Sequence, residues 1–508
     1  MRTKKAFYNM SASLMAQIIA IICGLITPRL ILSNFGSTYN GVINSAAQFL
    51  SMVSILRLGI AGATRVALYK TLASGDSIGT SRIMKATKQY MRKIAFVILL
   101  YAVLLMLIYP FISHNDLTKF DCALIIAIVS ISTLGEYFFG ISNVTLLTAD
   151  QSEYISNIAN IIAIISNTII TAILIKLHFS IFAVKLGSSV VYFITPLVLN
   201  IYVKKKYKLV SDCEPDTSAL KQRNAVAFHS IANIIHSNTD IVLLTLFADA
   251  KEISVYTVYY MVISKLKSML QVFTSGMEAA FGNMWFKKEM KTLNQVFRSF
   301  ELMIFSFATI VFSCAGILIL PFVELYTKSV TDVNYIRWEF AFLIVITEAI
   351  FCIRQPYLLL VQATGSYEET KKGAMLEAIV NLGSSIILVN LIGISGTIIG
   401  TLLANIIRTT QYILFTSKRL LNRSLKEVIK KGIVFIMAVV IIALLSSIIT
   451  SSLQLDLSWF TWLVQAAIVF GISIIVTTTI CLVFYKKDTL YLFAKAKSLV
   501  YRRTNKRN

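Results

Sequence analysis

The chain has 508 residues, of which 56% are hydrophobic and only 14% are charged, and its mean hydropathy is +0.74. This composition excludes an ordinary soluble domain and is typical of a helical protein that crosses the membrane many times. The net charge of +23 does not indicate a nucleic-acid partner, because the basic residues lie in short loops between apolar segments.

The apolar segments are continuous and do not alternate with polar residues, which argues against a transmembrane barrel and predicts an all-α fold. A spanning helix needs about 20 residues, and about fourteen segments of the chain meet that length. They are 9–33, 41–64, 94–114, 121–147, 154–177, 180–202, 225–248, 255–282, 296–323, 337–363, 372–391, 394–416, 432–452 and 462–485.

Basic residues are distributed unequally between the two sets of loops. The segments expected outside hold only Lys119, Lys251 and Lys328, and the other set is rich in Lys and Arg. Because cytoplasmic loops retain Lys and Arg, both termini are expected in the cytoplasm. The basic segment 65–93 is expected to form a helix on the inner leaflet.

The two halves of the chain resemble each other at an offset of about 214 residues. LLTADQSEY at 146–154 matches LVQATGSYEE at 360–369, and Glu136 matches Glu348. The sequence therefore predicts a six-helix lobe at 1–203, a charge-rich cytoplasmic linker at 204–224 and a second six-helix lobe at 225–417. Two further helices and a basic tail follow at 418–508.

Polar residues form a stripe along the expected span 225–248. The spacing between His229, Asn233, His236 and Asp240 is four, three and four residues, which places all of them on one helix face. Such a stripe in a membrane helix faces a cavity or neighbouring helices. Two interpretations stay open, a functional polar wall and interhelical hydrogen bonds that hold the bundle together.

The next span, 255–282, carries a second polar stripe. It consists of Tyr260, Ser264, Lys267, Gln271, Thr274 and Glu278. Lys267 lies near the middle of the span, where a lysine costs several kcal/mol unless water, an anion or an ion pair compensates it. The alternatives are a cationic cavity wall and an internal ion pair with Asp240 or Glu348.

Further intramembrane charges include Arg29, Arg57, Arg354 and Arg408. Several cations around one cavity would hold a phosphate or pyrophosphate group. Arg354 and Arg408 are also close enough to a predicted span end to reach lipid headgroups instead.

Motifs for enzymatic chemistry are missing from the sequence. There is no GxxxxGKS or GxxxxGKT loop, no metal-ligand spacing and no nucleophile–base motif, so we expect neither an enzyme nor a bound cofactor. The six scattered cysteines are interpreted as packing residues. Gly393, Gly396 and Gly400 are interpreted as close helix packing and not as a nucleotide loop.

The N-terminal NMSASLMAQIIAIICGLITPRLILSNFGSTYNGV, the two matching turns and GISGTIIGTLLA at 393–404 resemble a known family. It is the polysaccharide flippases, such as O-antigen and capsule repeat-unit flippases, of the multidrug/oligosaccharidyl-lipid/polysaccharide exporter superfamily. The resemblance implies two helical bundles around a central cavity that opens alternately to each side. It also implies a cargo of undecaprenyl pyrophosphate joined to a short glycan.

The resemblance further implies two sets of functional residues. Arg29, Arg57 and Lys267 match the cationic cavity residues of the lipid II flippase relatives. Those relatives also bind a sodium ion at positions that match Asp240, Glu377, Asn381 and Thr397. In those relatives the amide precedes the carboxylate along the helix, whereas here Glu377 precedes Asn381. The alternative to an ion site is a buried hydrogen-bond network among these four residues. The coupling ion is expected to be Na⁺ or H⁺.

The expected function is a flippase that moves a lipid-linked oligosaccharide from the inner to the outer leaflet for cell-surface polysaccharide synthesis. Membrane lipids and other polysaccharide assembly proteins are its expected partners. A multidrug cation antiporter on the same fold is one alternative, and it would predict a cavity dominated by acidic residues. A polysaccharide polymerase or ligase is the enzymatic alternative, which the short outer loops disfavour.

Overall fold

The computed structural model describes residues 2–53, 57, 60–207, 209–210, 213–217, 239–274, 276–452 and 456–494. Side chains are described for all of these except residues 2–7, 271–273 and 452. The described chain is helical apart from turns, short connections and one isolated bridge between His114 and Asp249. The predicted all-α class is therefore confirmed.

The chain divides into two compact units. The first comprises Met1–Thr257 and Ser329–Val333, and the second comprises Val258–Lys328 and Asn334–Asn508. The division falls later in the chain than the linker at 204–224, because the residues just before it pack on the first unit's longest helix. There Ser45 Oγ lies 2.6 Å from Thr245 Oγ1, and Asn40 Nδ2 donates to Ser254 Oγ at 2.7 Å.

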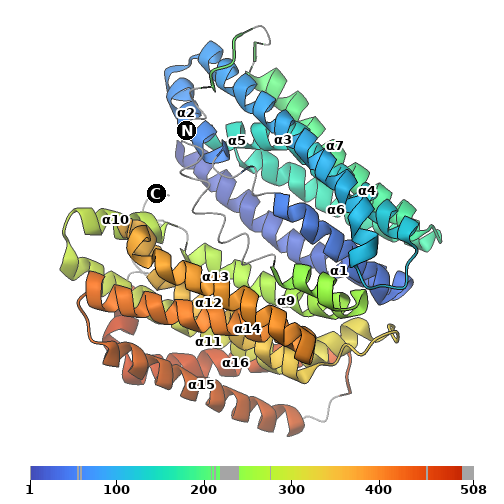
Figure 1. The fold of residues 1–508 in the computed structure, drawn as a ribbon. Coiled ribbons are helices and arrows are strands. Elements are labelled where there is room, and N and C mark those ends of the chain that lie inside the picture. Colours follow the sequence, from blue (N-terminus) through green and yellow to red (C-terminus); the bar gives the residue numbers. More distant parts are fainter. Residues whose placement is uncertain are drawn as a thin grey trace. The chain divides into compact units, whose positions relative to one another are not determined.

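The helices of the first unit are shown in blue and cyan in Figure 1. They are α1 (Arg2–Met52), α2 (Ile60–Ser74), α3 (Ser77–Ile112), α4 (Lys119–Gly135), the π-helical turn η2 (Glu136–Gly140), α5 (Ile141–Ala149), α6 (Tyr154–Lys176) and α7 (Ile181–Tyr207). Along these helices, α1 packs against α6 and α4 packs against both α3 and α7.

Two local features of the first unit differ from the expected elements. The predicted turn between the first two spans is only a kink in α1, where Gly36 adopts φ 82° and ψ 178°. The basic segment 65–93 is not a separate surface helix, because α3 begins at Ser77 and continues directly into the third span. The side chain of Asp76 caps that start by accepting a hydrogen bond from the Gly79 amide at 2.8 Å.

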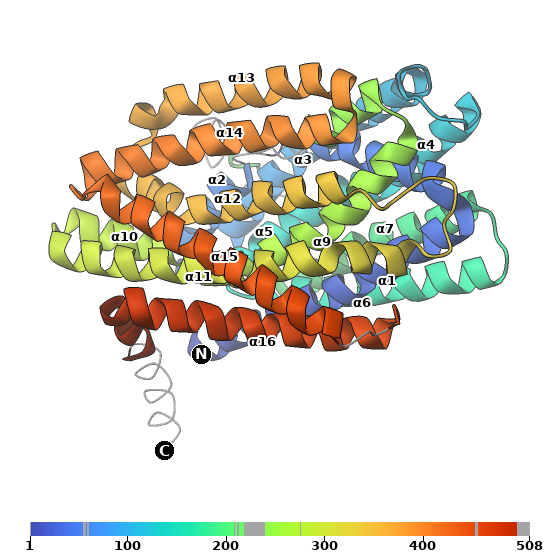
Figure 2. The ribbon, with the colours of Figure 1, turned by 90° about the horizontal axis from the view of Figure 1, so that it is seen from below.

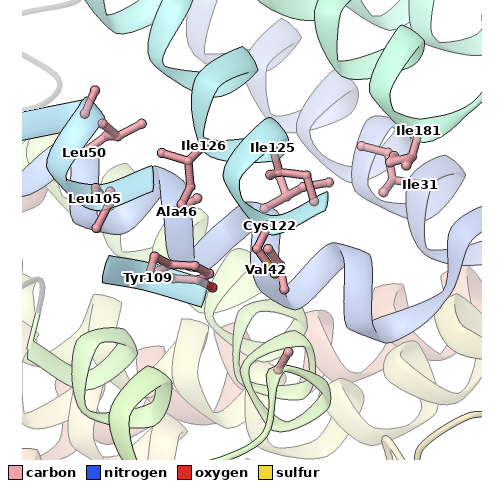
Figure 3. Packing of buried hydrophobic residues seen from close by; sticks show 13 residues of the cluster. Ile31, Val42, Ala46, Leu50, Leu105, Tyr109, Cys122, Ile125, Ile126 and Ile181 are labelled. Atoms are coloured by element: carbon pink, nitrogen blue, oxygen red, sulfur yellow. The ribbon is translucent and has the colours of Figure 1, made fainter. Parts of the chain in front are cut away.

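The core of the first unit joins residues from α1, α3, α4 and α7 (Figure 3). Tyr109 and Ile126 are fully buried in it, and Cys122 is 1% exposed. Cys122 fills the core as a small apolar residue, as the sequence predicts for the scattered cysteines.

The helices of the second unit run from green through yellow and orange to red in Figures 1 and 2. They are the later part of α9 (Ala250–Thr274), then α10 (Met277–Phe286), α11 (Met290–Thr327), α12 (Trp338–Thr364), α13 (Tyr367–Ile392), α14 (Ile394–Phe415), the π-helical turn η4 (Thr416–Leu420), α15 (Leu425–Ser452) and α16 (Trp459–Phe484). The two helices beyond the predicted repeat, α15 and α16, pack against each other and against α11.

The expected span 255–282 is not one helix. It breaks between α9 and α10, where Gly276 has φ 81°, in the left-handed region that glycine adopts without steric cost. The predicted polar stripe therefore ends at Thr274, and Glu278 lies on a different helix.

Eleven helices among the described residues are long and apolar enough to cross a membrane. The protein is thus a multi-pass helical membrane protein, as predicted. The expected span 225–248 lies largely outside the described residues, and its described end is helical from residue 239 to residue 247.

Close packing of α13 and α14 depends on glycine. A Cβ atom on Gly396 would overlap the backbone of Leu388, and one on Gly400 would overlap the hydroxyl of Ser385. The predicted packing role is confirmed for Gly396 and Gly400. It is wrong for Gly393, which forms the turn between the two helices at φ 60° and has nothing within 4 Å of an added Cβ.

We predict that Gly396→Ala lowers the free energy of unfolding by about 1–3 kcal/mol, because the added methyl group forces the two backbones apart. Thermal unfolding in detergent micelles measures the change. Gly383→Ala is the matched control on α13, since nothing lies within 4 Å of its added Cβ. Equal stability of the two variants would contradict the packing argument.

Candidate functional site

An ion pair lies inside the first unit, at a depth where the sequence predicts membrane. Arg57, in the connection from α1 to α2, donates from Nη1 to Glu136 Oε1 at 2.7 Å. The two side chains are 39% and 52% exposed, so neither charge is sealed in the core. Exposure to hydrocarbon would be costly, and the pair therefore requires a polar space beside it.

The structure provides that space as a pocket of about 740 Å³. Its walls come from the start of α2, from α4, η2 and α5, and from α6 and α7. Its charged lining residues are Arg57, Arg65, Glu136 and Glu153, and its polar ones are Ser132, Thr133, Thr145, Thr148, Ser156, Asn157, Asn160, Tyr192 and Thr195. Apolar side chains such as Ile141, Val144 and Leu199 line it as well, so the pocket can hold a ligand that combines hydroxyl groups with apolar faces.

Glu136 owes its position to a local irregularity of the helix. It is the first residue of η2, the π-helical turn that interrupts the helix running from Lys119 to Ala149. A π-turn takes one more residue than an α-turn and so changes the direction of the side chains around it, and such turns are frequent at functional sites. The sequence EYFFG contains no pattern that predicts this π-turn.

A second ion pair lies inside the second unit. Lys267 of α9 donates from Nζ to Glu348 Oε2 of α12 at 2.7 Å, and its ammonium lies 4.0 Å from the centre of the Phe351 ring. The side chains are 25% and 9% exposed. The sequence left open whether Lys267 lines a cavity or forms an ion pair with Asp240 or Glu348. The structure contains the ion pair with Glu348.

The two ion pairs occupy corresponding positions in the two halves of the sequence. Lys267 follows Arg57 by 210 residues (267 − 57), and Glu348 follows Glu136 by 212 (348 − 136). Both offsets are close to the repeat offset predicted from the turns. Each half thus contributes one basic residue and one carboxylate at matching places. Of these residues, only the two glutamates were predicted to match from the sequence.

Arg354 and Arg408 are engaged in a buried network between α12, α13 and α14. Arg354 Nη1 lies 2.7 Å from Glu377 Oε1, and Arg408 Nε lies 3.3 Å from Glu377 Oε2. Arg408 also donates to the Thr370 carbonyl at 2.7 Å. Both arginines are almost fully buried, so they do not reach out to lipid headgroups, and they hold three helices together.

The residues of the candidate cation site have local partners. Glu377 binds the two arginines, Asn381 Nδ2 donates to Thr401 Oγ1 at 3.0 Å, and Thr397 Oγ1 donates to the Ile394 carbonyl at 2.9 Å. Asp240 is buried and accepts from the Tyr256 hydroxyl at 2.9 Å. Asp240 belongs to the first unit and the other three belong to the second. The joint site stays a prediction.

The remaining predicted residues are less informative. Arg29 is partly buried in α1 directly after Pro28, and Glu278 is exposed on α10. His229, Asn233 and His236 lie outside the described residues, as does the side chain of Gln271. Within the described part of the chain, no group of three or more His, Cys, Asp or Glu residues could hold a metal ion.

A charged cluster around Glu301 of α11 was not predicted from the sequence. Glu301 is 1% exposed and lies 2.5 Å from both Arg423 Nη2 and Lys431 Nζ, and it accepts a short hydrogen bond from the Tyr357 hydroxyl. Lys431 belongs to α15, so this cluster fixes the first additional helix to α11 and α12. A single acid in the apolar run FELMIFSF is the signal that could have revealed it, because such an acid needs a cationic partner.

Comparison with known proteins shows the fold. No family model and no curated protein matches the sequence. The lipid II flippase MurJ in an inward closed conformation matches with a TM-score of 0.69 and 15% identity, covering 94% of this chain and 98% of that one. An inward-facing multidrug resistance transporter of the MATE family of the MOP superfamily matches with a TM-score of 0.60 and 13% identity, covering 82% and 98%.

A third solved structure, the Vibrio cholerae MATE transporter VcmN, matches with a TM-score of 0.55 and 14% identity, covering 83% of this chain and 98% of that one. At these identities the similarity establishes the fold alone. This chain therefore has the helical fold that MurJ and the MATE transporters share.

We predict that Glu301→Gln lowers the free energy of unfolding by about 3–5 kcal/mol, because it leaves Arg423 and Lys431 buried without a counter-charge. Glu324→Gln, at an exposed position of the same helix, is expected to change stability by no more than about 0.5 kcal/mol. Thermal unfolding of both variants in one detergent provides the comparison. A Glu301→Gln protein as stable as the Glu324→Gln control would show that the cluster does not hold α15.

Proposed function

We propose that this protein is a membrane transporter that moves a polyprenyl-pyrophosphate-linked oligosaccharide from the inner to the outer leaflet. The observation that carries the proposal is the half-exposed Arg57–Glu136 ion pair, which opens into a polar pocket within a bundle of membrane helices. A sugar chain and a pyrophosphate cannot cross hydrocarbon unaided, and a polar pocket inside the bundle shelters such groups while the lipid tail stays in the bilayer.

The chemistry of the Lys267–Glu348 ion pair suits an anionic headgroup. Arg57 and Lys267 are each neutralised by one carboxylate, so neither basic group is left without a counter-charge. An arriving phosphate oxygen is a strong acceptor for a guanidinium or an ammonium group. We propose that Lys267 exchanges its carboxylate for the pyrophosphate of the cargo during transport by alternating access, whereas Arg57 stays paired with Glu136.

The fold comparisons support a transporter. MurJ is a flippase for lipid II, and it covers nearly the whole of this chain. The sequence resemblance to polysaccharide flippases of the MOP superfamily points to the same class of cargo. An O-antigen or capsule repeat unit, a bacterial plasma membrane, cytoplasmic termini and polysaccharide assembly proteins as partners are parts of this proposal.

An ion gradient would drive the cycle. Asp240 and the group of Glu377, Asn381 and Thr397 stay the proposed sites for a coupling Na⁺ or H⁺. In the described structure their oxygens and nitrogens are bound by neighbouring side chains and carbonyls. Ion binding would therefore have to compete with these contacts.

A multidrug cation antiporter is the second candidate function, and the similarity to two MATE transporters favours it. The pocket in the first unit favours the flippase, because its two arginines balance its two glutamates. A cationic drug would be better held by a site with excess negative charge. A polymerase or ligase has less support, since these structural relatives are transporters.

We predict that the protein, reconstituted in proteoliposomes, transfers a fluorescent lipid-linked oligosaccharide between leaflets and that Lys267→Met reduces the rate at least tenfold. The reason is the loss of the cation that binds the headgroup. Lys265→Met is the matched control, since two residues along an α-helix turn the side chain by about 200°. The double variant Lys267→Met/Glu348→Gln removes both charges. It therefore tests whether transport is lost because the cation is missing or because Glu348 is left buried without a partner.

Two results would count against the proposed function. If folded wild-type protein gives no transfer above empty vesicles, the proposed flippase function is wrong. Transport of a cationic dye instead would establish the antiporter function. Transfer at the wild-type rate by Lys267→Met would remove that residue from headgroup binding.

A further inference from the structure

The pocket of the first unit has polar groups that the protein itself does not use. The side chains of Asn157 and Asn160 line it from α6 and make no hydrogen bond with any described residue. The Nε atom of Arg65 is buried and likewise has no partner in the described part of the chain. The buried guanidinium nitrogen is costly to leave unpaired unless water or a ligand binds it. The amides of Asn157 and Asn160 are more accessible and can bind a ligand in the pocket.

The charge of the pocket distinguishes between possible ligands. Arg57 and Arg65 contribute two positive charges, and Glu136 and Glu153 contribute two negative ones. The lining is therefore neutral in sum, and Arg57 is already bound to Glu136. A pyrophosphate would need an excess of cations, and a cationic drug would need an excess of carboxylates. An uncharged ligand with many hydroxyl groups fits this balance.

The hydrogen-bonding groups fit the same ligand. A sugar hydroxyl both donates and accepts, so it pairs with side chains that offer both functions in one plane. Asn157 and Asn160 provide such amides one turn apart, and the carboxylates and arginines provide more acceptors and donors. The Thr148 hydroxyl donates to the Val144 carbonyl in its own helix, which leaves its oxygen lone pairs as acceptors.

The size and the place of the pocket agree with loading from the cytoplasm. Its volume of about 740 Å³ lies within the range of about 300–1,000 Å³ that is usual for small-molecule sites. It extends from Glu136, in the middle of a spanning helix, to Glu153 at the turn before α6. The asymmetry of Lys and Arg places this turn at the cytoplasmic face, where a flippase must collect its cargo.

We propose that this pocket is a glycan-binding subsite, which holds the sugar portion of the cargo separately from its pyrophosphate. The inference rests on the proposed function for the identity of the cargo. Asn157 and Asn160 bind sugar hydroxyls, Arg65 donates to the same glycan, and the Arg57–Glu136 pair marks the inner end of the subsite.

Direct binding to the purified protein tests the subsite with two probes. The first is the oligosaccharide released by mild acid from the polyprenyl-linked pool of the cells that make the protein, and the second is inorganic pyrophosphate. We expect Asn157→Leu/Asn160→Leu to weaken binding of the oligosaccharide at least tenfold in isothermal titration and to leave pyrophosphate binding unchanged. Asn160→Leu alone, at an exposed position with no described hydrogen bond, is expected to give a smaller loss and to fold normally.

Asn390→Leu is the matched control, because Asn390 is an exposed asparagine on a helix of the second unit and does not line the pocket. Wild-type affinity for the oligosaccharide in folded Asn157→Leu/Asn160→Leu protein would overturn the subsite, as would an equal loss of pyrophosphate binding. The wild-type transfer assay separates the two proposals. If the wild-type protein transfers the cargo and the asparagine variants do not change the rate, only the proposed subsite is contradicted. If the wild-type protein gives no transfer, the proposed flippase function is contradicted.

Discussion

Charge placed among membrane helices has to be compensated, and this constraint organises the structure. Glu301 is surrounded by Arg423, Lys431 and Tyr357, and Glu377 is bound by two arginines. These networks are buried, and each joins at least three segments of the second unit. The Arg57–Glu136 pair obeys the same constraint but is half exposed. We therefore distinguish two kinds of paired charge by their exposure. Buried pairs hold the helices together, and partly exposed pairs can contact a cargo.

The repeat predicted from the sequence is consistent with the presence of one such ion pair in each unit. A basic residue and a glutamate, about 80 residues apart in each half, form a 2.7 Å contact in each unit. The two copies have diverged in their surroundings. Lys267 and Glu348 are more buried and lie against Phe351, whereas Arg57 and Glu136 line a wide polar pocket. Within the described chain, the first unit thus has the more accessible site, and the second contributes a more enclosed cation.

Much of the fold follows from patterns that are local in sequence. Continuous apolar runs predicted the helices, and closely spaced glycines predicted the contact of α13 with α14. The break at Gly276 was missed because a single glycine in an apolar run has no local signal that distinguishes a kink from a continuous helix. The acidic partner of Arg57 and the basic partners of Glu301 were missed because they lie 79 and 122–130 residues away. Only the packing of helices, together with the π-turn at Glu136, brings those side chains together.

The central claim is that polar space reaches the Arg57–Glu136 pair inside the first unit. The most direct measurement is the reaction of single cysteines with a membrane-impermeant thiol reagent, in a chain whose six native cysteines are replaced. The account predicts fast labelling of Asn160→Cys, which faces the pocket, and slow labelling of Ile162→Cys, which is 59% exposed on another face of the same helix. Equal labelling at the two positions, or none at Asn160→Cys, would contradict it.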